Sequence, residues 1–129
     1  MMPMPANSFL RRILLLDALA SGATGLLMAL AAAPLQDWLG VPAMLLSAAG
    51  WCLILFAGLL VVLARSQSLP SGAVVAVIVL NGLWVVGSVV VLLAGLIQPS
   101  ALGYAFVLGQ AIAVALLAEM ETVGLRGVS

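Results

Sequence analysis

The segment LRRILLLDALASGATGLLMALAAA, residues 10–33, determines what kind of protein this is. It opens on a basic pair, Arg11 and Arg12, and continues as an almost unbroken apolar run of about twenty residues, the length that crosses a bilayer as a helix. One acid, Asp17, interrupts the run. A carboxylate inside such a helix costs roughly 2.5–3.5 kcal/mol on insertion scales. The segment therefore predicts a membrane helix whose acid either has a partner or has a function.

The composition extends this interpretation to the whole chain. Hydrophobic residues make up 66% of the sequence and charged residues 6%, whereas about 25% of residues are charged in soluble domains. The 129 residues suffice for about four spans joined by short turns. We predict an all-α integral membrane four-helix bundle, a single domain over residues 1–129, with spans at residues 10–33, 42–64, 71–96 and 101–118.

Helix-breaking residues and charges place the turns and the orientation. Residues 34–41, which contain Pro34 and Gly40, are predicted to form the first loop, and the charged residues from Glu119 onward mark the exit of the fourth span. All four arginines fall on one side of this arrangement: Arg11, Arg12, Arg65 and Arg126. By the positive-inside rule, an up-down-up-down bundle with both termini in the cytoplasm is expected, in a bacterial inner membrane.

Self-comparison indicates a tandem duplication of helical hairpins. A shift of 64 residues aligns Asp17-Ala18-Leu19 with Asn81-Gly82-Leu83, and a shift of 53 aligns residues 47–51 with residues 100–104. If the first hairpin is repeated by the second, Asp17 and Asn81 are equivalent positions at similar depth. Chance matches in a sequence rich in Ala, Leu, Gly and Val are the alternative.

The absence of several residue types excludes whole classes of function. The net charge is zero and there is no lysine, so no basic patch for nucleic acid exists. Histidine is absent and Cys52 is the single cysteine, which removes disulfides, His-ligated haem and the usual zinc sites. We therefore expect no metal, no cofactor and no enzyme activity, and we expect Cys52 to be a buried apolar side chain.

Asp17 has two interpretations. At 1.5 Å per residue it lies about 9 Å beyond Arg11, in the cytoplasmic third of the bilayer. It can pair with an arginine of its own or a neighbouring helix and so stabilise packing. Alternatively, it is an exchangeable proton or cation site inside the bundle.

Nearer the midplane, each predicted helix carries polar or amphipathic side chains. They form either an interhelical hydrogen-bond network or the lining of a cavity for an amphipathic ligand, in which an indole faces a cation and Asp17 supplies the counter-charge. The candidate ion or substrate site consists of Asp17, Trp51, Asn81, Trp84 and Gln110, with Ser21, Thr24 and Ser88 at similar depth.

Small residues at four-residue spacing predict a close helix contact. Ala105, Gly109 and Ala113 share one face of the fourth span. This face is expected to meet another helix or another subunit, so the bundle is predicted to form a homo-oligomer or to join a larger membrane complex.

Several motifs together resemble a group of small four-span bacterial inner-membrane proteins of unassigned function. They are Arg11-Arg12, Asp17, ASGATG at residues 20–25, NGLW at residues 81–84, AEME at residues 118–121 and GLR at residues 124–126. The sequence is also similar, more weakly, to the small multidrug resistance transporters, which have four short-looped spans, an embedded acid in the first and a functional tryptophan in the third. Asp17 and Trp84 occupy the matching positions, and the resemblance implies the same four-span fold.

Two functions are compatible with these observations. The first is a non-enzymatic membrane protein, a packing or accessory subunit or a homo-oligomeric membrane component. The second is a proton-coupled carrier of small amphipathic or cationic solutes that uses Asp17.

Overall fold

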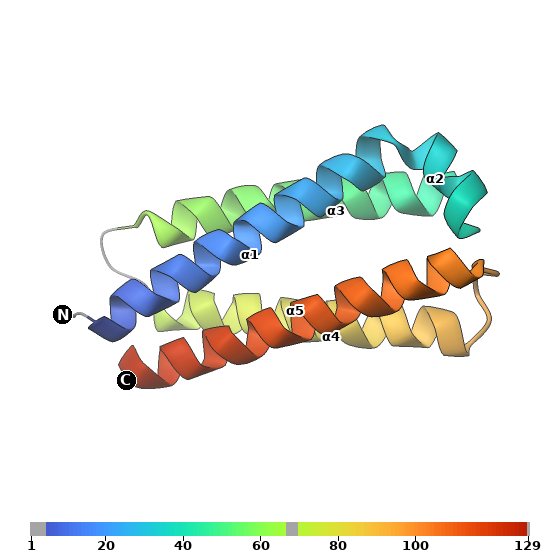
Figure 1. The fold of residues 1–129 in the computed structure, drawn as a ribbon. Coiled ribbons are helices and arrows are strands. Elements are labelled where there is room, and N and C mark those ends of the chain that lie inside the picture. Colours follow the sequence, from blue (N-terminus) through green and yellow to red (C-terminus); the bar gives the residue numbers. More distant parts are fainter. Residues whose placement is uncertain (1–4, 67–69, 129) are drawn as a thin grey trace.

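The computed structural model describes residues 5–66 and 70–128, and these residues form five helices (Figure 1). Four of them, α1, α3, α4 and α5, are long and apolar enough to cross a membrane, which confirms the prediction of four apolar helices of membrane-spanning length. The helices are α1 (Pro5–Leu30), α2 (Ala32–Leu39), α3 (Ala43–Ala64), α4 (Ser71–Leu93) and α5 (Ala101–Val128).

The predicted loop at residues 34–41 is wrong, because most of this segment forms α2. The first membrane helix ends at Leu30, three residues earlier than predicted. Pro34 lies in the first turn of α2, where a missing backbone N–H leaves no helical hydrogen bond unmade. Gly40 ends the helix with a positive φ of 71°, and its N–H donates to the Gln36 carbonyl oxygen. Proline and glycine therefore delimit a short helix here.

The predicted end of the fourth span at residue 118 is also wrong. Helix α5 continues to Val128, and Glu121, which was expected to mark the exit from the membrane, is fully buried inside the bundle. Gly124 lies against Leu10, so close that an added Cβ would meet that side chain at 3.1 Å. The last turns of α5 thus pack on the first turns of α1.

The bundle consists of two hairpins, α1 with α3 and α4 with α5 (Figure 1). Helix α1 also contacts α5, and α2 contacts both α3 and α5. The start of α1 and the end of α5 lie at one end of the bundle, which we call the terminal end, and α2 lies at the other, the α2 end (Figure 1).

The first hairpin is packed through glycine. A Cβ at Gly50 would lie 2.6 Å from the Ala29 nitrogen and 2.7 Å from the Gly25 carbonyl oxygen. Real Cβ atoms do not approach backbone so closely, so α1 and α3 can touch here only because both positions lack a side chain. Small residues bring membrane helices together in this way.

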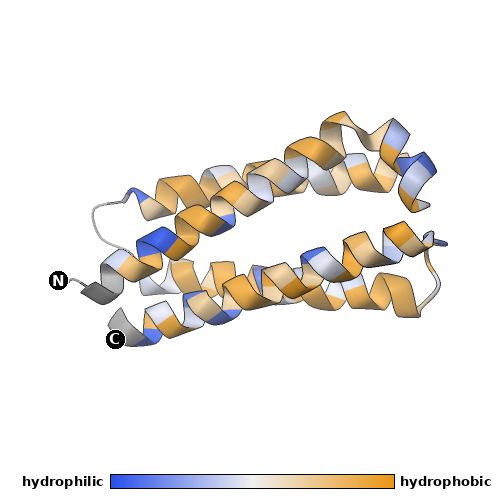
Figure 2. Ribbon diagram, in the orientation of Figure 1, coloured by the Kyte–Doolittle hydropathy of each residue, from blue (hydrophilic) through white to orange (hydrophobic). Residues whose placement is uncertain are grey.

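Two apolar clusters hold the bundle, one near each end. The terminal-end cluster contains Leu10, Leu14, Ala18, Leu60, Ala64, Val74 and Val77, and the α2-end cluster contains Met28, Leu35, Leu39, Val41, Leu46, Leu53 and Ile97. Hydrophobic residues predominate along the four long helices (Figure 2), and many large hydrophobic side chains are exposed on the outside of the bundle. Cys52 belongs to this outward surface, so the expectation of a buried cysteine is wrong. A lipid environment explains such exposure, because hydrocarbon imposes no penalty on apolar side chains.

Candidate functional site

The most unusual feature of the bundle is a group of polar side chains buried toward the terminal end. It comprises Asp17 and Ser21 of α1, Asn81 of α4 and Glu121 of α5, and we call it the carboxyl cluster. Asp17 and Glu121 are both 0% exposed. Buried acids are rare within membrane-spanning segments and mark either an ion pathway or a structural partner.

One amide group joins the two acids. The Asn81 Nδ2 donates to Asp17 Oδ2 at 2.8 Å and to Glu121 Oε1 at 2.9 Å. The Ser21 hydroxyl, one helical turn beyond Asp17, donates to Asp17 Oδ1 at 3.1 Å. Among the described residues, Glu121 Oε2 is buried without a hydrogen-bond partner. An asparagine side chain can bridge in this way because its NH₂ group carries two donors.

Among the described residues, the structure shows no arginine hydrogen-bonded to Asp17, contrary to the predicted Asp17–arginine pair. Within the described part of the chain, the hydrogen bonds that Asp17 accepts come from Ser21 and Asn81. Arg11 donates instead to the carbonyl oxygens of Ala64, at 2.6 Å, and Ser66. These carbonyls lie at the C-terminal end of α3, where a helix leaves its last acceptors unpaired and favours positive charge.

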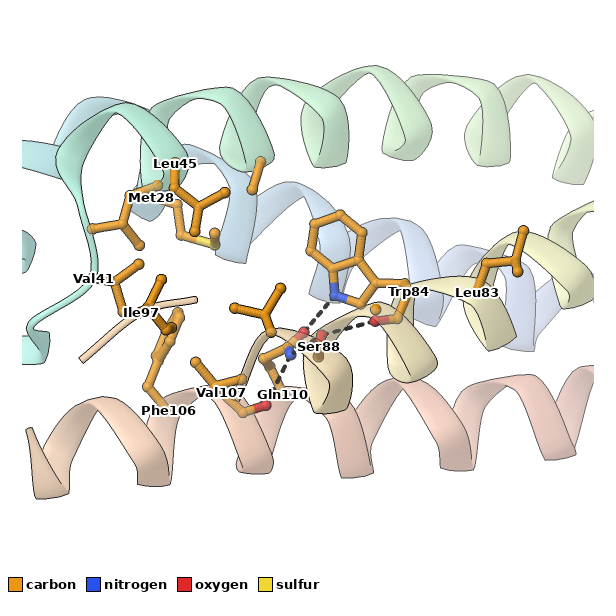
Figure 3. Close-up of a pocket in the computed structure, with 14 residues that line it drawn as sticks. Met28, Val41, Leu45, Leu83, Trp84, Ser88, Ile97, Phe106, Val107 and Gln110 are labelled. Atoms are coloured by element: carbon orange, nitrogen blue, oxygen red, sulfur yellow. Dashed lines mark hydrogen bonds between the residues drawn. The ribbon is translucent and has the colours of Figure 1, made fainter. Parts of the chain in front are cut away.

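A cavity of about 300 Å³ lies between the two hairpins toward the α2 end (Figure 3). The first hairpin and its linker line it with apolar side chains such as Met28 and Leu46. The second hairpin contributes Trp84, Phe106 and Gln110 among others. Its volume lies at the lower end of the range of small-molecule pockets.

The polar groups of the cavity wall bind one another (Figure 3). The Trp84 indole N–H donates to Gln110 Oε1 at 2.6 Å, and Gln110 Nε2 donates to Ser88 Oγ at 3.0 Å and to the Val107 carbonyl oxygen at 2.8 Å. Ser88 in turn donates to the Trp84 carbonyl oxygen at 2.8 Å. The lining residues include no acid and no base. The cavity is therefore suited to an uncharged, largely apolar guest.

The cavity lies between two separate connections of the hairpins. Toward the terminal end, the carboxyl cluster joins α1, α4 and α5. At the α2 end, the Ser100 N–H donates to the Leu39 carbonyl oxygen at 2.9 Å and the Ser100 hydroxyl donates to the Trp38 carbonyl oxygen at 2.7 Å. Gly103 approaches the Leu39 carbonyl so closely that any Cβ there would collide with it. We call this second connection the α2-end contact.

The structure divides the five candidate site residues into separate groups. Asp17 and Asn81 meet in the carboxyl cluster, whereas Trp84 and Gln110 meet in the cavity wall. Trp51 is 55% exposed and does not line the cavity. The direct contact of Asp17 with Asn81, 64 residues apart, joins the two positions that the proposed duplication makes equivalent.

Glu121 is the site residue that sequence reasoning missed. Its position in the charged segment that follows the apolar run suggested an interfacial residue. The available signal was helical spacing, since Leu117, Glu121 and Gly124 fall on one face of α5 and are all buried. That spacing becomes informative only when the helix is known to continue beyond residue 118.

Comparisons with protein-family models, with curated proteins and with solved structures give no match. The functional interpretation therefore depends on the geometry of the carboxyl cluster and the cavity.

Proposed function

We propose that this protein is a small integral membrane carrier that moves uncharged, apolar or amphipathic molecules through the cavity between its two hairpins. The observation that carries the proposal is the cavity itself, which lies along the bundle between the carboxyl cluster and the α2-end contact. A carrier binds its solute near the middle of the membrane and opens to one side at a time. Two connections at opposite ends of one cavity suit that mechanism.

The chemistry of the wall supports an uncharged solute. Trp84, Gln110 and Ser88 satisfy one another, so a guest need not supply hydrogen bonds to them. Asp17 does not line the cavity, so it is not the counter-charge of a bound cation. The indole and Phe106 rings instead present apolar faces. Of the amphipathic or cationic solutes expected from the sequence, we therefore propose only the uncharged, amphipathic ones.

The arginines support the orientation of this carrier. Arg11 contacts the end of α3 next to Arg65, and Arg126 lies near the end of α5. We place this end in the cytoplasm by the positive-inside rule, which makes the carrier an up-down-up-down bundle of the bacterial inner membrane with cytoplasmic termini. A tandem duplication of hairpins would relate the two halves by an axis along the membrane normal.

A matched pair of glycine substitutions tests the proposal. Gly87 lines the cavity and Gly82, on the same helix, does not, while an added Cβ meets nothing within 4 Å at either position. Gly87→Leu should fill the cavity, and Gly82→Leu should provide the same gain in helix propensity without filling it. The probe is a fluorescent NBD-labelled octyl glycoside in proteoliposomes, whose outer-leaflet pool is bleached with dithionite.

We expect the wild type to accelerate transbilayer movement of this probe over protein-free liposomes. Gly87→Leu should return the rate to the protein-free value, and Gly82→Leu should leave it at the wild-type value. Equal rates in the wild type and in both variants would contradict the carrier proposal.

The second candidate is the accessory or packing subunit, and one observation favours it. Ala105, Gly109 and Ala113 are all exposed on the single chain, with nothing within 4 Å of a Cβ at Gly109. Another helix can approach such a face closely. In-membrane cross-linking of the wild type and Gly109→Leu tests this: a homo-oligomer that disappears in the variant, without transport activity in either, would favour the subunit interpretation.

A further inference from the structure

The carboxyl cluster contains more hydrogen-bond acceptors than donors. The donors are shared unequally between Asp17 and Glu121. Asp17 accepts one hydrogen bond at each oxygen, from Ser21 and from Asn81. Glu121 accepts one at Oε1, and its Oε2 is fully buried without a partner among the described residues. An ionised carboxylate is stabilised by the donors that surround it, and a buried charge without them costs much more than a neutral carboxyl.

From this asymmetry we infer that Glu121 is a proton-binding residue, which carries a proton on Oε2 while Asp17 stays ionised beside it. The exchangeable site then lies on the last membrane helix instead of the first. Proton binding there requires neither the cavity nor any solute. Asn81 is the positioning residue, because its single amide holds both carboxyl groups in one place.

The charges around Glu121 come from few elements. Helix α1 contributes Asp17, and Arg11 on the same helix donates to carbonyl oxygens at the end of α3. The residues of α3 and α4 include no Asp, Glu, Lys or Arg. On α5, Glu119 and Arg126 are exposed. The nearest titratable group with a described connection to Glu121 is therefore Asp17.

Loss of the proton changes the forces that close the terminal end. When the Oε2–H bond breaks and the proton passes to water, the pair changes from one negative charge to two, both held by the same Asn81 amide. The two acids belong to α1 and α5, so their repulsion pushes apart the helices that join the hairpins. Rebinding of a proton restores the O–H bond and the closed arrangement. Proton binding would thus control opening at this end of the bundle.

The test is infrared difference spectroscopy on the lipid-reconstituted protein without any solute, which follows the C=O stretch of a protonated carboxyl group. We expect the wild type to show such a band at neutral pH. Glu121→Gln should abolish it, whereas Asp17→Asn should retain it. Glu119→Gln, an exposed acid two residues away on the same helix, is the matched control and should also retain the band.

Three results would overturn the inference. They are the absence of the band in the wild type, a band that survives Glu121→Gln but disappears in Asp17→Asn, and a band that sodium chloride removes at constant pH. The last would identify the site as a sodium site. Circular dichroism and size-exclusion chromatography show whether each variant folds. If Glu121→Gln does not fold, the Asp17→Asn result decides, because the band must persist there.

A second measurement tests the coupling to movement. Spin labels at Arg12 and Val123, both exposed, report the separation of α1 and α5 at the terminal end. Raising the pH should lengthen this distance in the wild type and leave it constant in Glu121→Gln. A distance that does not change with pH in the wild type would refute the coupling. Because Gly87→Leu blocks only the cavity, its proton band should persist even if the carrier proposal fails.

Discussion

Replacing Asn81 by leucine removes the amide that holds both acids while keeping the branched shape of the side chain. In the wild type, Asn81 donates to Asp17 at 2.8 Å and to Glu121 at 2.9 Å. A hydrogen bond to a charged group contributes about 2 kcal/mol, and a neutral interhelical bond in a membrane contributes about 0.6 kcal/mol. We therefore expect Asn81→Leu to lower the free energy of unfolding by about 2.6 kcal/mol, most of it from the bond to Asp17.

Making Asn81→Leu in the Asp17→Asn and Glu121→Gln variants distinguishes the contribution of the bond to Asp17 from that of the bond to Glu121. In Asp17→Asn the acceptor is neutral, so Asn81→Leu should cost only about 1.2 kcal/mol. In Glu121→Gln the acceptor oxygen remains, and the cost should stay within about 0.6 kcal/mol of the wild-type value. The coupling between Asp17 and Asn81 then amounts to about 1.4 kcal/mol, roughly a tenfold change in the unfolding equilibrium constant.

The assay is reversible unfolding in mixed micelles at increasing mole fractions of sodium dodecyl sulfate, followed by circular dichroism. An equal cost of Asn81→Leu in the Asp17→Asn background and in the wild type would contradict a charged hydrogen bond between Asn81 and Asp17. Asp17 would then be uncharged in the folded protein, and the assignment of the proton to Glu121 would fall with it.

Further substitutions test the packing and the cavity wall. Gly50→Ala should destabilise the protein by about 1–3 kcal/mol because its Cβ would press on backbone, whereas Gly58→Ala, with open space around it, should be neutral or stabilising; the same unfolding assay compares them. Gly103→Ala should break the α2-end contact and speed hydrogen exchange of the Ser100 amide, and unchanged exchange would argue against that contact. Trp84→Phe removes the bond to the Gln110 side chain and should cost about 1 kcal/mol while the helical content is retained.

The membrane-spanning helices followed from sequence because they are determined locally. A run such as residues 43–64 is apolar enough to cross hydrocarbon by itself, and a helix is the structure that satisfies its backbone there. The short helix α2 and the full length of α5 could not be predicted from the sequence. Pro34 has a different effect in a first turn than inside a helix, and the end of α5 is stabilised by α1.

The sequence alone marked individual polar side chains at membrane depth, Asp17 and Asn81 among them. It could not determine which of them meet, because helix rotation is set by packing between helices. Only the tertiary structure showed that Glu121 is buried in the core and not at the membrane interface. It also showed that an amide, and not an arginine, binds Asp17, and that Trp84 and Gln110 bind each other away from the acids. The physical reason is the distance over which each effect acts. Hydropathy is a property of each segment by itself, whereas a hydrogen bond of about 3 Å requires side chains from different helices to be in contact.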